Sequence, residues 1–167
     1  MSGIRRLLVV VDMQRDFVDG ALGSEAARKI VPAVQALVAE ADEVVYTQDT
    51  HEENYLDTHE GKFLPVPHCI RGTEGHEILP EVFRAGARVF EKSTFGSASL
   101  AGYAVRYDEI TLCGVCTDIC VVSNALLIRA FAPEACVRVA ASACAGTSPE
   151  AHQAALLTMK SCQIEII

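Results

Sequence analysis

Three residues able to do chemistry lie where apolar segments of this chain end. Asp12 directly follows a short apolar run, Lys92 closes another, and Cys120 lies shortly after the run 109–114. A thiol can act as a nucleophile, a carboxylate can carry its proton, and an ammonium group favours the charged form of both. If these side chains meet, they predict covalent catalysis by a cysteine.

The position of Cys120 gives its thiol a reason to be reactive. The pattern after residue 116 is helical, so Cys120 falls in the first turn of a helix opened by Thr117 and Asp118. Unpaired N–H groups and the helix dipole favour a thiolate there, and the same groups can stabilise an oxyanion. A nearby Lys92 would favour both the thiolate and an ionised Asp12. The sequence therefore predicts a thiol of low pKa.

The elements that must position these residues alternate between strand and helix. We expect strands at 4–11, 43–48, 87–92, 109–114, 136–141 and 163–167, and helices at 24–41, 74–84, 97–103, 117–131 and 148–161. The strands are near-continuous apolar runs, which is typical of a parallel sheet covered on both faces by helices. The predicted fold is one domain over residues 1–167, a Rossmann-like three-layer α/β/α arrangement with a mostly parallel sheet of about six strands. Ligands of such folds bind beyond the carboxyl ends of the strands, so the three reactive residues should share one rim.

Composition excludes several classes of protein. Half of the residues are hydrophobic and 22% are charged, which indicates a globular and not a disordered chain. The formal charge is −8, and basic residues form no cluster beyond Arg5 and Arg6, so we expect no nucleic-acid partner. No apolar stretch has the length of a membrane span and no signal-peptide cleavage site follows the first run, so we expect a cytoplasmic protein. The seven cysteines should then be free thiols, most of them buried.

Five segments occur here in the order in which they occur in a known enzyme family. They are VVDMQRDF at 10–17, TQDTH at 47–51, PHCIRGT at 67–73, EKSTF at 91–95 and GVCTDICV at 114–121. Together they resemble the isochorismatase-like cysteine hydrolase superfamily, close to nicotinamidase, over about residues 4–145. One segment alone is a weak signal, whereas five in order at plausible spacing are a strong one.

The resemblance implies a reaction and the residues that carry it. Asp12, Lys92 and Cys120 match the family's catalytic triad, in which Cys120 would attack an amide and form a thioester while Asp12 shuttles the proton. The backbone N–H groups of Cys116 and Cys120 match its oxyanion hole, and a cis peptide bond is expected at Val115–Cys116. The implied activity is a nicotinamidase-like cleavage of a small-molecule amide into ammonia and a carboxylic acid. Proteins of this superfamily are often homo-oligomers.

The resemblance also implies a metal site beside the triad. Asp49, His51 and His68 match three of the family's ligands for a divalent ion, and the fourth has no clear match. The candidates for the fourth ligand are Asp57, His59 and Glu60. A mixed set of nitrogen and oxygen ligands suits zinc, iron or manganese. No organic cofactor is implied. His76 and His152 are expected at the surface, as is His59 if it is not a ligand.

The expected substrate pocket departs from the family pattern. Phe17 matches a residue that packs against the substrate. Nicotinamidases commonly place a Trp shortly before the Pro-x-His segment, where it stacks on the pyridine ring. This chain has no Trp, and Pro65-Val66-Pro67 precedes His68. Nicotinamide is therefore the leading substrate, with another amide left open.

Two other interpretations of the sequence stay open. One is a different branch of the superfamily that cleaves an N-carbamoyl amide, a ureide or a vinyl ether; the ether branch is disfavoured because its members do not use a nucleophilic cysteine. The other is a non-enzymatic redox or metal-binding thiol protein, since Cys113-x2-Cys116-x3-Cys120 resembles a thiolate ligand set. Whether Cys116 tunes the oxyanion hole or only fills space is also open.

Overall fold

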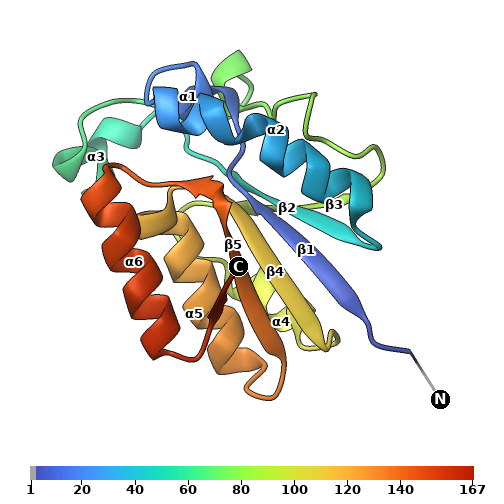
Figure 1. The fold of residues 1–167 in the computed structure, drawn as a ribbon. Helices are drawn as coiled ribbons and strands as arrows, with labels where there is room; N and C mark the ends of the chain where they lie inside the picture. The colour runs from blue at the N-terminus through green and yellow to red at the C-terminus, as the bar shows by residue number, and fades with distance from the viewer. Residues whose placement is uncertain (1–2) are drawn as a thin grey trace.

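The computed structural model describes residues 3–167 and has three layers, with one sheet between helices (Figure 1). All neighbouring strands pair in parallel, in the order β3-β2-β1-β4-β5-β6. The strands are β1 (Arg6–Val11), β2 (Val44–Asp49), β3 (Arg88–Lys92), β4 (Glu109–Val115), β5 (Cys136–Ala145) and β6 (Glu165–Ile166). The predicted fold class is confirmed.

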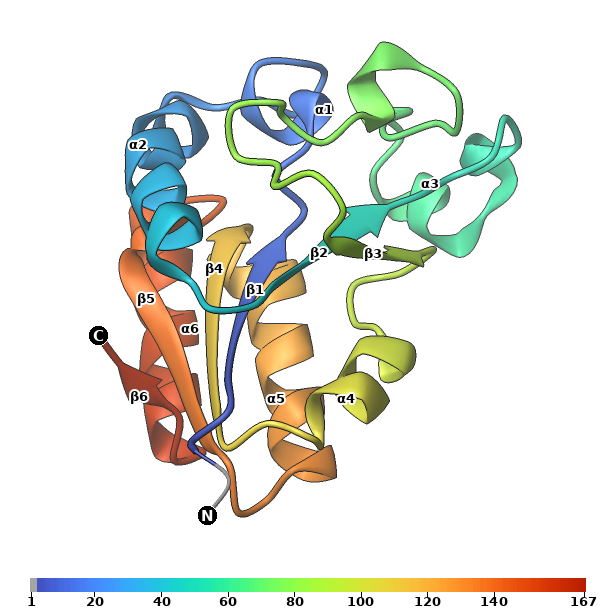
Figure 2. The same cartoon turned by 90° about the vertical axis from the view of Figure 1, so that its right-hand side faces the viewer.

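Helices cover both faces of this sheet. They are α1 (Arg15–Val18), α2 (Glu25–Glu40), α3 (His59–Phe63), α4 (Ala98–Ala104), α5 (Val122–Phe131) and α6 (Pro149–Ser161), with 3-10 turns η1 (Tyr55–Asp57) and η2 (Glu74–His76) and a π-helical turn η3 (Thr117–Val121). Helix α2 lies on one face, where it contacts β1, β4 and β5, while α4 and α5 pack together on the other (Figure 2). Helix α6 packs beside α5.

Local sequence explains where the longer helices begin. Ser24, Ser97 and Ser148 each precede a helix, and the side chain of each accepts a hydrogen bond from an N–H group of the first turn. Such caps satisfy donors that have no partner within the helix. Pro149 is the first residue of α6, where its missing N–H removes no hydrogen bond.

The sheet carries the core and also creates the place for a site. Val9, Val10, Ile110 and Leu112 of the central strands have no exposed surface, and each such burial stabilises the fold by about 1.5–3 kcal/mol relative to exposure. The strand order reverses at β1, which pairs with β2 on one side and β4 on the other. Segments that leave β1 and β4 therefore diverge and leave a crevice at their carboxyl ends.

Three expected elements differ from the structure. The helix expected at 74–84 is wrong, because only η2 forms there; Pro80 disfavours a helix, and Ile78 instead forms an antiparallel bridge with Gln14. The helix expected at 117–131 begins with the turn η3, and α5 follows it. Strand β5 extends to Ala145, beyond its expected end, and pairs with β4 again after a register shift.

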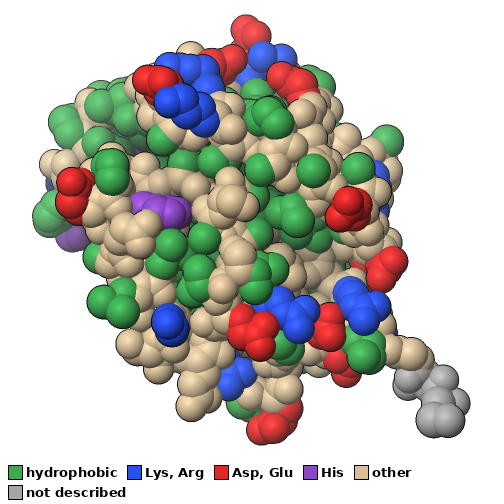
Figure 3. Space-filling model, viewed as in Figure 1, with side chains coloured by type: hydrophobic (Ala, Val, Ile, Leu, Met, Phe, Trp, Pro, Cys, Tyr) green, Lys and Arg blue, Asp and Glu red, His purple; other side chains and the backbone are tan. Residues whose placement is uncertain are grey.

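Charged side chains of both signs are mixed on one face of the molecule. On the face drawn in Figure 3, Lys and Arg lie beside Asp and Glu at both ends, with hydrophobic side chains between them. This face therefore carries no continuous basic patch, in keeping with the net charge of −8. Within residues 3–167, no helix combines the length and the apolar character needed to cross a membrane.

Candidate active site

Asp12 lies at the carboxyl end of β1, where the chain turns away from the sheet. Its φ of 49° is in the left-handed region, which few residues other than glycine adopt. Thr47 of β2 anchors it: Thr47 Oγ1 donates to Asp12 Oδ1 at 2.6 Å, and the Asp12 N–H donates to Thr47 Oγ1 at 3.1 Å. The fully buried carboxylate is thereby fixed, with Oδ2 left to face other groups.

The ammonium group of Lys92, at the end of β3, joins three parts of the site. Its Nζ lies 2.7 Å from Asp12 Oδ2, 3.5 Å from Asp49 Oδ1 and 3.5 Å from Cys120 Sγ, and it donates to the Thr94 carbonyl at 3.0 Å. Burial lowers the pKa of Lys92, but the negative charges of Asp12, Cys120 and Asp49 outweigh burial and raise this pKa. The side chain is therefore an ammonium ion at neutral pH.

Cys120 lies in η3, the turn between β4 and α5, and only 6% of its surface is exposed. Asn124, fully buried one turn later, donates to the Cys120 carbonyl at 2.8 Å and to the Phe95 carbonyl at 3.1 Å. The same side chain accepts a hydrogen bond from the Ser97 N–H at 2.9 Å. Asn124 thus ties the turn that carries the thiol to the segment that follows β3.

The expectation of a low pKa at Cys120 is wrong for the protein alone. Burial raises the pKa of the thiol, and the charge of Asp12 raises it further, whereas Lys92 lowers it. Desolvation and the charge of Asp12 thus outweigh the charge of Lys92. Burial also raises the pKa of Asp12, in spite of the opposing charge of Lys92. The site therefore supplies a carboxylate able to accept the thiol proton, and not a preformed thiolate.

Two contacts fix the start of the turn that carries Cys120. Thr117 Oγ1 and His152 Nδ1 lie 2.7 Å apart, and the Asp118 carboxylate accepts hydrogen bonds from the Thr147 N–H at 2.8 Å and hydroxyl at 2.6 Å. His152 is therefore half-buried against this turn and not the free surface residue expected from the sequence. The peptide bond Val115–Cys116 is cis, as expected.

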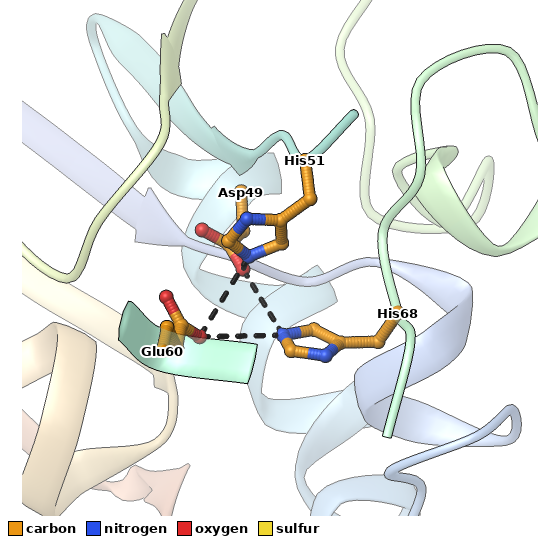
Figure 4. Close-up of side chains that lie close together, drawn as sticks. All are labelled: Asp49, His51, Glu60 and His68. Atoms are coloured by element: carbon orange, nitrogen blue, oxygen red, sulfur yellow. Dashed lines mark hydrogen bonds and ion pairs between the residues drawn. The ribbon is translucent and has the colours of Figure 1, made fainter. Parts of the chain in front are cut away.

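Four potential metal ligands converge beside the triad (Figure 4). Asp49 ends β2, His51 follows two residues later, Glu60 lies in the first turn of α3, and His68 belongs to the loop that follows. One ligand atom from each lies within 4.8 Å of all the others. The structure thus brings together the three residues expected from the sequence and adds Glu60 as the fourth.

The other two candidates for the fourth ligand lie outside this group. Asp57 ends η1 and is exposed. His59 is exposed as well, and its ring packs on Phe63 with centroids 4.9 Å apart. Helix α3 starts at His59, and its first turn directs Glu60 toward the two histidines of the group (Figure 4).

The distances within the group suit one bound cation. His51 Nε2 lies 2.9 Å from Asp49 Oδ2 and 3.7 Å from Glu60 Oε1, and His68 Nε2 lies 3.5 and 3.7 Å from the same two atoms. Ligand atoms of one tetrahedral zinc ion, each bonded at about 2.0–2.1 Å, are about 3.3–3.5 Å apart. His68 Nδ1 donates to the Val66 carbonyl at 2.8 Å, which leaves Nε2 able to coordinate.

The charges in this group also favour a cation. Burial raises the pKa of Glu60, and the charge of Asp49 raises it further. Burial would raise the pKa of Asp49 too, but hydrogen bonds with His51 and His68 lower it overall. Burial would lower the pKa of His68, yet the hydrogen bond with Asp49 raises it. A divalent cation would replace the protons that now lie between these carboxylate and imidazole groups. The mixed nitrogen and oxygen donors fit zinc, iron or manganese.

A cavity of about 980 Å³ lies against part of the metal group and against one member of the triad. Its polar lining includes His51, Glu60 and Lys92. Its apolar lining consists of Phe63, Leu64, Phe95 and Ile119. Phe17 does not line it; its ring packs against that of His68, with centroids 5.4 Å apart.

The structure does not assemble the cysteines into a ligand set. All seven have free thiols, and Cys113 is fully buried within β4. Burial raises the pKa of Cys116 to about 12. Within the described part of the chain, the one cluster able to hold a metal contains no cysteine. The interpretation of Cys113, Cys116 and Cys120 as thiolate ligands therefore has no structural support.

Sequence reasoning missed the buried polar residues that support the site. Thr47, Gln14 and Asn124 are fully buried, and each bonds a candidate functional residue. Their only sequence signal is a polar residue within an apolar or helical segment, which does not name its partner. His76, expected at the surface, is also buried, and its Nε2 lies 2.9 Å from Thr50 Oγ1.

The match to a known family covers almost the whole chain. Residues 6–167 match the Isochorismatase domain. The chain belongs to the isochorismatase family. The relatives within this family include the nicotinamidase of Schizosaccharomyces pombe, 25% identical over 205 residues, with 96% of this chain and 91% of the relative covered. An uncharacterized isochorismatase family protein of Bacillus subtilis, PncA, is 29% identical over 143 residues, with 74% of this chain and 78% of that protein covered.

Solved structures share the isochorismatase family fold. The pyrazinamidase of Pyrococcus horikoshii in complex with zinc has a TM-score of 0.84 at 29% identity, with 98% of both chains covered. The nicotinamidase/pyrazinamidase PncA of Bacillus subtilis has a TM-score of 0.80 at 29% identity, with 98% of this chain and 99% of that one covered. The resemblance inferred from the five sequence segments is thereby confirmed.

Proposed function

We propose that this isochorismatase family member is a cysteine amidohydrolase that cleaves a small-molecule amide into ammonia and a carboxylic acid. The observation that carries the proposal is the position of Lys92 Nζ, 2.7 Å from Asp12 Oδ2 and 3.5 Å from Cys120 Sγ, beside the cavity. The relatives and solved structures named nicotinamidase and pyrazinamidase support an amide as the substrate class.

The first half of the reaction forms a thioester. Cys120 Sγ attacks the amide carbonyl carbon while Asp12 accepts the thiol proton, and the backbone N–H groups of Cys116 and Cys120 stabilise the oxyanion. Asp12 then gives this proton to the amide nitrogen as the C–N bond breaks, which releases ammonia. A buried carboxylate of raised pKa suits this exchange because it can hold the proton between the two steps.

The second half hydrolyses the thioester. Water attacks the carbonyl carbon while Asp12 accepts its proton, and the C–S bond breaks to release the acid. The proton then returns from Asp12 to the sulfur, so Cys120 and Asp12 end in their starting states. Lys92 keeps its own proton throughout, because its pKa is raised, and its charge stabilises Asp12 and the sulfur when each is ionised.

The metal group adjoins this chemistry through Asp49. Its Oδ2 faces the histidines and its Oδ1 lies 3.5 Å from Lys92 Nζ. Asp49, His51, Glu60 and His68 would hold a divalent cation, which supplies positive charge beside the cavity for a polar atom of the substrate. The fit of these ligands supports the proposal of a metal at this place.

The cavity allows amides other than nicotinamide. Its volume of about 980 Å³ is near the upper end of ordinary small-ligand pockets, and its apolar walls contain Phe63 and Phe95 but no Trp. Nicotinamide stays the leading substrate, and a larger aryl or alkyl amide, or an N-carbamoyl amide, is the second candidate that this lining favours. The cytoplasmic location stays a prediction from the sequence, and the homo-oligomer stays a prediction from the family resemblance.

The test is ammonia release from nicotinamide, pyrazinamide and a panel of aliphatic, aryl and carbamoyl amides, with Cys120→Ala as control. Release that disappears in Cys120→Ala supports the amidohydrolase, and the best substrate identifies the branch. If no amide is cleaved and Cys120 also fails to react with an electrophile, the proposed function is wrong.

A further inference from the structure

The loop that follows β1 carries three polar side chains at alternate positions, and each of them reaches a different part of the site. We refer to residues 12–17, which include the start of α1, as the first loop. Asp12 faces Lys92, and the other two residues, Gln14 and Asp16, contact the segments that carry the metal group. Neither Gln14 nor Asp16 takes part in the proposed reaction.

The side chain of Gln14 forms hydrogen bonds with the backbone of β2 at a point where no residue of β1 pairs with it. The ladder between β1 and β2 ends at the pair Val11–Thr47, because the chain turns away at Asp12. Beyond this point the Asp49 N–H donates to Gln14 Oε1 at 2.8 Å, and Gln14 Nε2 donates to the Asp49 carbonyl at 2.8 Å. The side-chain amide thus makes the two hydrogen bonds that a backbone neighbour would make.

This pairing fixes the orientation of a metal ligand. Gln14 is fully buried, and its Nε2 also donates to the His76 carbonyl at 2.9 Å, so all three bonds hold one amide orientation. The peptide groups of Asp49 cannot rotate without breaking these bonds. The Asp49 carboxylate, whose Oδ2 lies 2.9 Å from His51 Nε2, is held with its backbone.

Asp16 forms a hydrogen bond with the backbone next to a second ligand of the metal group, His68. Its Oδ2 accepts a hydrogen bond from the Cys69 N–H at 2.8 Å, directly after His68. Cys69 has a φ of 47°, a left-handed conformation that is unfavourable for a residue other than glycine and needs support from its surroundings. Gly75 lies against the same carboxylate: a Cβ there would lie 2.1 Å from Asp16 Oδ2. The Asp16 contact therefore helps to set the backbone that aims His68.

We infer that Gln14 and Asp16 are positioning residues for the metal group, Gln14 through Asp49 and Asp16 through His68. The inference rests on the proposed metal site. The first loop then has two roles. It carries the acid/base residue Asp12, and it holds in position two metal ligands, Asp49 and His68, that come from segments distant in sequence. Polar residues behind metal ligands commonly contribute about 10- to 100-fold to metal affinity.

The first test compares Gln14→Met with Gln48→Met. Gln48 is the matched control, because its Nε2 donates to the same His76 carbonyl at 2.9 Å but makes no hydrogen bond with the backbone of Asp49. The zinc affinity of the full chain is measured by competition with a chromogenic chelator, alongside thermal melting. We expect Gln14→Met to bind zinc about 10- to 100-fold more weakly and Gln48→Met to change less than about twofold. A folded Gln14→Met with wild-type zinc affinity overturns the role of Gln14.

The second test addresses Asp16 and does not depend on how Gln14→Met folds. Asp16→Ala should weaken zinc binding about tenfold, whereas Asp16→Asn should restore most of the affinity because its amide oxygen can still accept from the Cys69 N–H. Gly75→Ala should act like Asp16→Ala, since it displaces the carboxylate, and Asp19→Ala, an exposed change nearby, should have no effect. Equal affinities of Asp16→Ala and Asp19→Ala overturn the role of Asp16.

Zinc binding by the wild-type protein distinguishes a failure of the positioning role from a failure of the proposed metal site. If the wild type binds no zinc in the same competition assay, both the metal site and its positioning are wrong. If the wild type binds zinc and the Gln14 and Asp16 variants bind it equally well, only the positioning is wrong. Neither result depends on amide turnover, so a wrong substrate leaves the inference testable.

Discussion

The nucleophile can be tested by changing one atom. Cys120→Ser nearly keeps the volume of a side chain that is 6% exposed, so we expect little change in the melting temperature. A serine hydroxyl is a far weaker nucleophile beside the same carboxylate, so turnover of the best amide should fall below roughly 1% of wild type. Steady-state ammonia release by the purified variant checks this. Activity above a few per cent of wild type would show that Cys120 is not the nucleophile.

Asp12 has opposite effects on thiol reactivity and on turnover. Its charge raises the pKa of Cys120, so Asp12→Asn should lower this pKa and speed alkylation by iodoacetamide at pH 8. The same variant loses its acid/base group, so amide turnover should fall at least about 100-fold. Lys92→Met should slow alkylation, because the Lys92 charge lowers the pKa of Cys120.

Peptide mass spectrometry identifies the alkylated residue in that experiment. Slower labelling of Cys120 in Asp12→Asn than in wild type would show that the charge of Asp12 does not control the reactivity of this thiol, and amide turnover by Asp12→Asn at the wild-type rate would contradict the acid/base role of Asp12.

A carboxylate outside the site connects two elements and gives a pH-dependent stability. Tyr103 of α4 donates to Glu43 Oε1 at 2.8 Å, and the Tyr107 hydroxyl donates to the same atom just before β4. The hydrogen bond from Tyr107 holds the pKa of Glu43 below its usual 4.5. A depressed pKa in the folded state means that the stabilisation is present above pH 4.5 and is lost as the pH falls through the folded-state pKa.

We therefore expect Glu43→Ala to lower the free energy of unfolding by about 1–2 kcal/mol at pH 7 and by less in acid. Urea denaturation between pH 7 and pH 3 measures this difference. The exposed neighbour Asp42, changed to Ala, serves as the control. An equal loss at every pH would show that the contribution of Glu43 is packing and not charge.

Elements with strong local signals are the ones that the sequence predicts. Buried strands such as β1 are apolar along their whole length, and serine caps such as Ser24 and Ser148 mark helix starts, so these are right to within a few residues. The segment 74–84 fails because its conformation depends on a distant partner: Ile78 forms a bridge with Gln14. Periodicity within a segment carries no information about such a partner.

The residues of the candidate site also divide into those that the sequence can locate and those that it cannot. Residues of unusual type at strand ends, such as Asp12 and Lys92, can be located from the sequence because parallel strands end at one edge. Glu60 could only be named among three candidates, since the start of α3 decides which side chain faces His68. The low pKa expected for Cys120 fails because the helix pattern does not reveal the burial that opposes it.

At the scale of the molecule, the parallel sheet places all of this chemistry at one end. Figure 2 shows β1 and β4 pointing toward the end that carries α1 and α3. The long segment 50–87 between β2 and β3 has only short helical pieces. It supplies three of the four potential metal ligands, namely His51, Glu60 and His68. Its folded form therefore depends on contacts at the site more than on secondary structure of its own.

A bound cation should therefore stabilise the segment 50–87 and, through it, the whole fold. Without a cation, the negative charges of the Asp49 and Glu60 carboxylates repel each other, and a bound cation would relieve this repulsion. Zinc at about 100 times its dissociation constant should add about 2.7 kcal/mol to the free energy of unfolding. Removal by a chelator should lower the melting temperature and expose this segment to limited proteolysis, while alkylation of Cys120 changes less. Glu60→Gln should show a smaller response to zinc. If chelation, verified by metal analysis, changes neither melting nor proteolysis, the four residues serve a structural purpose without a metal.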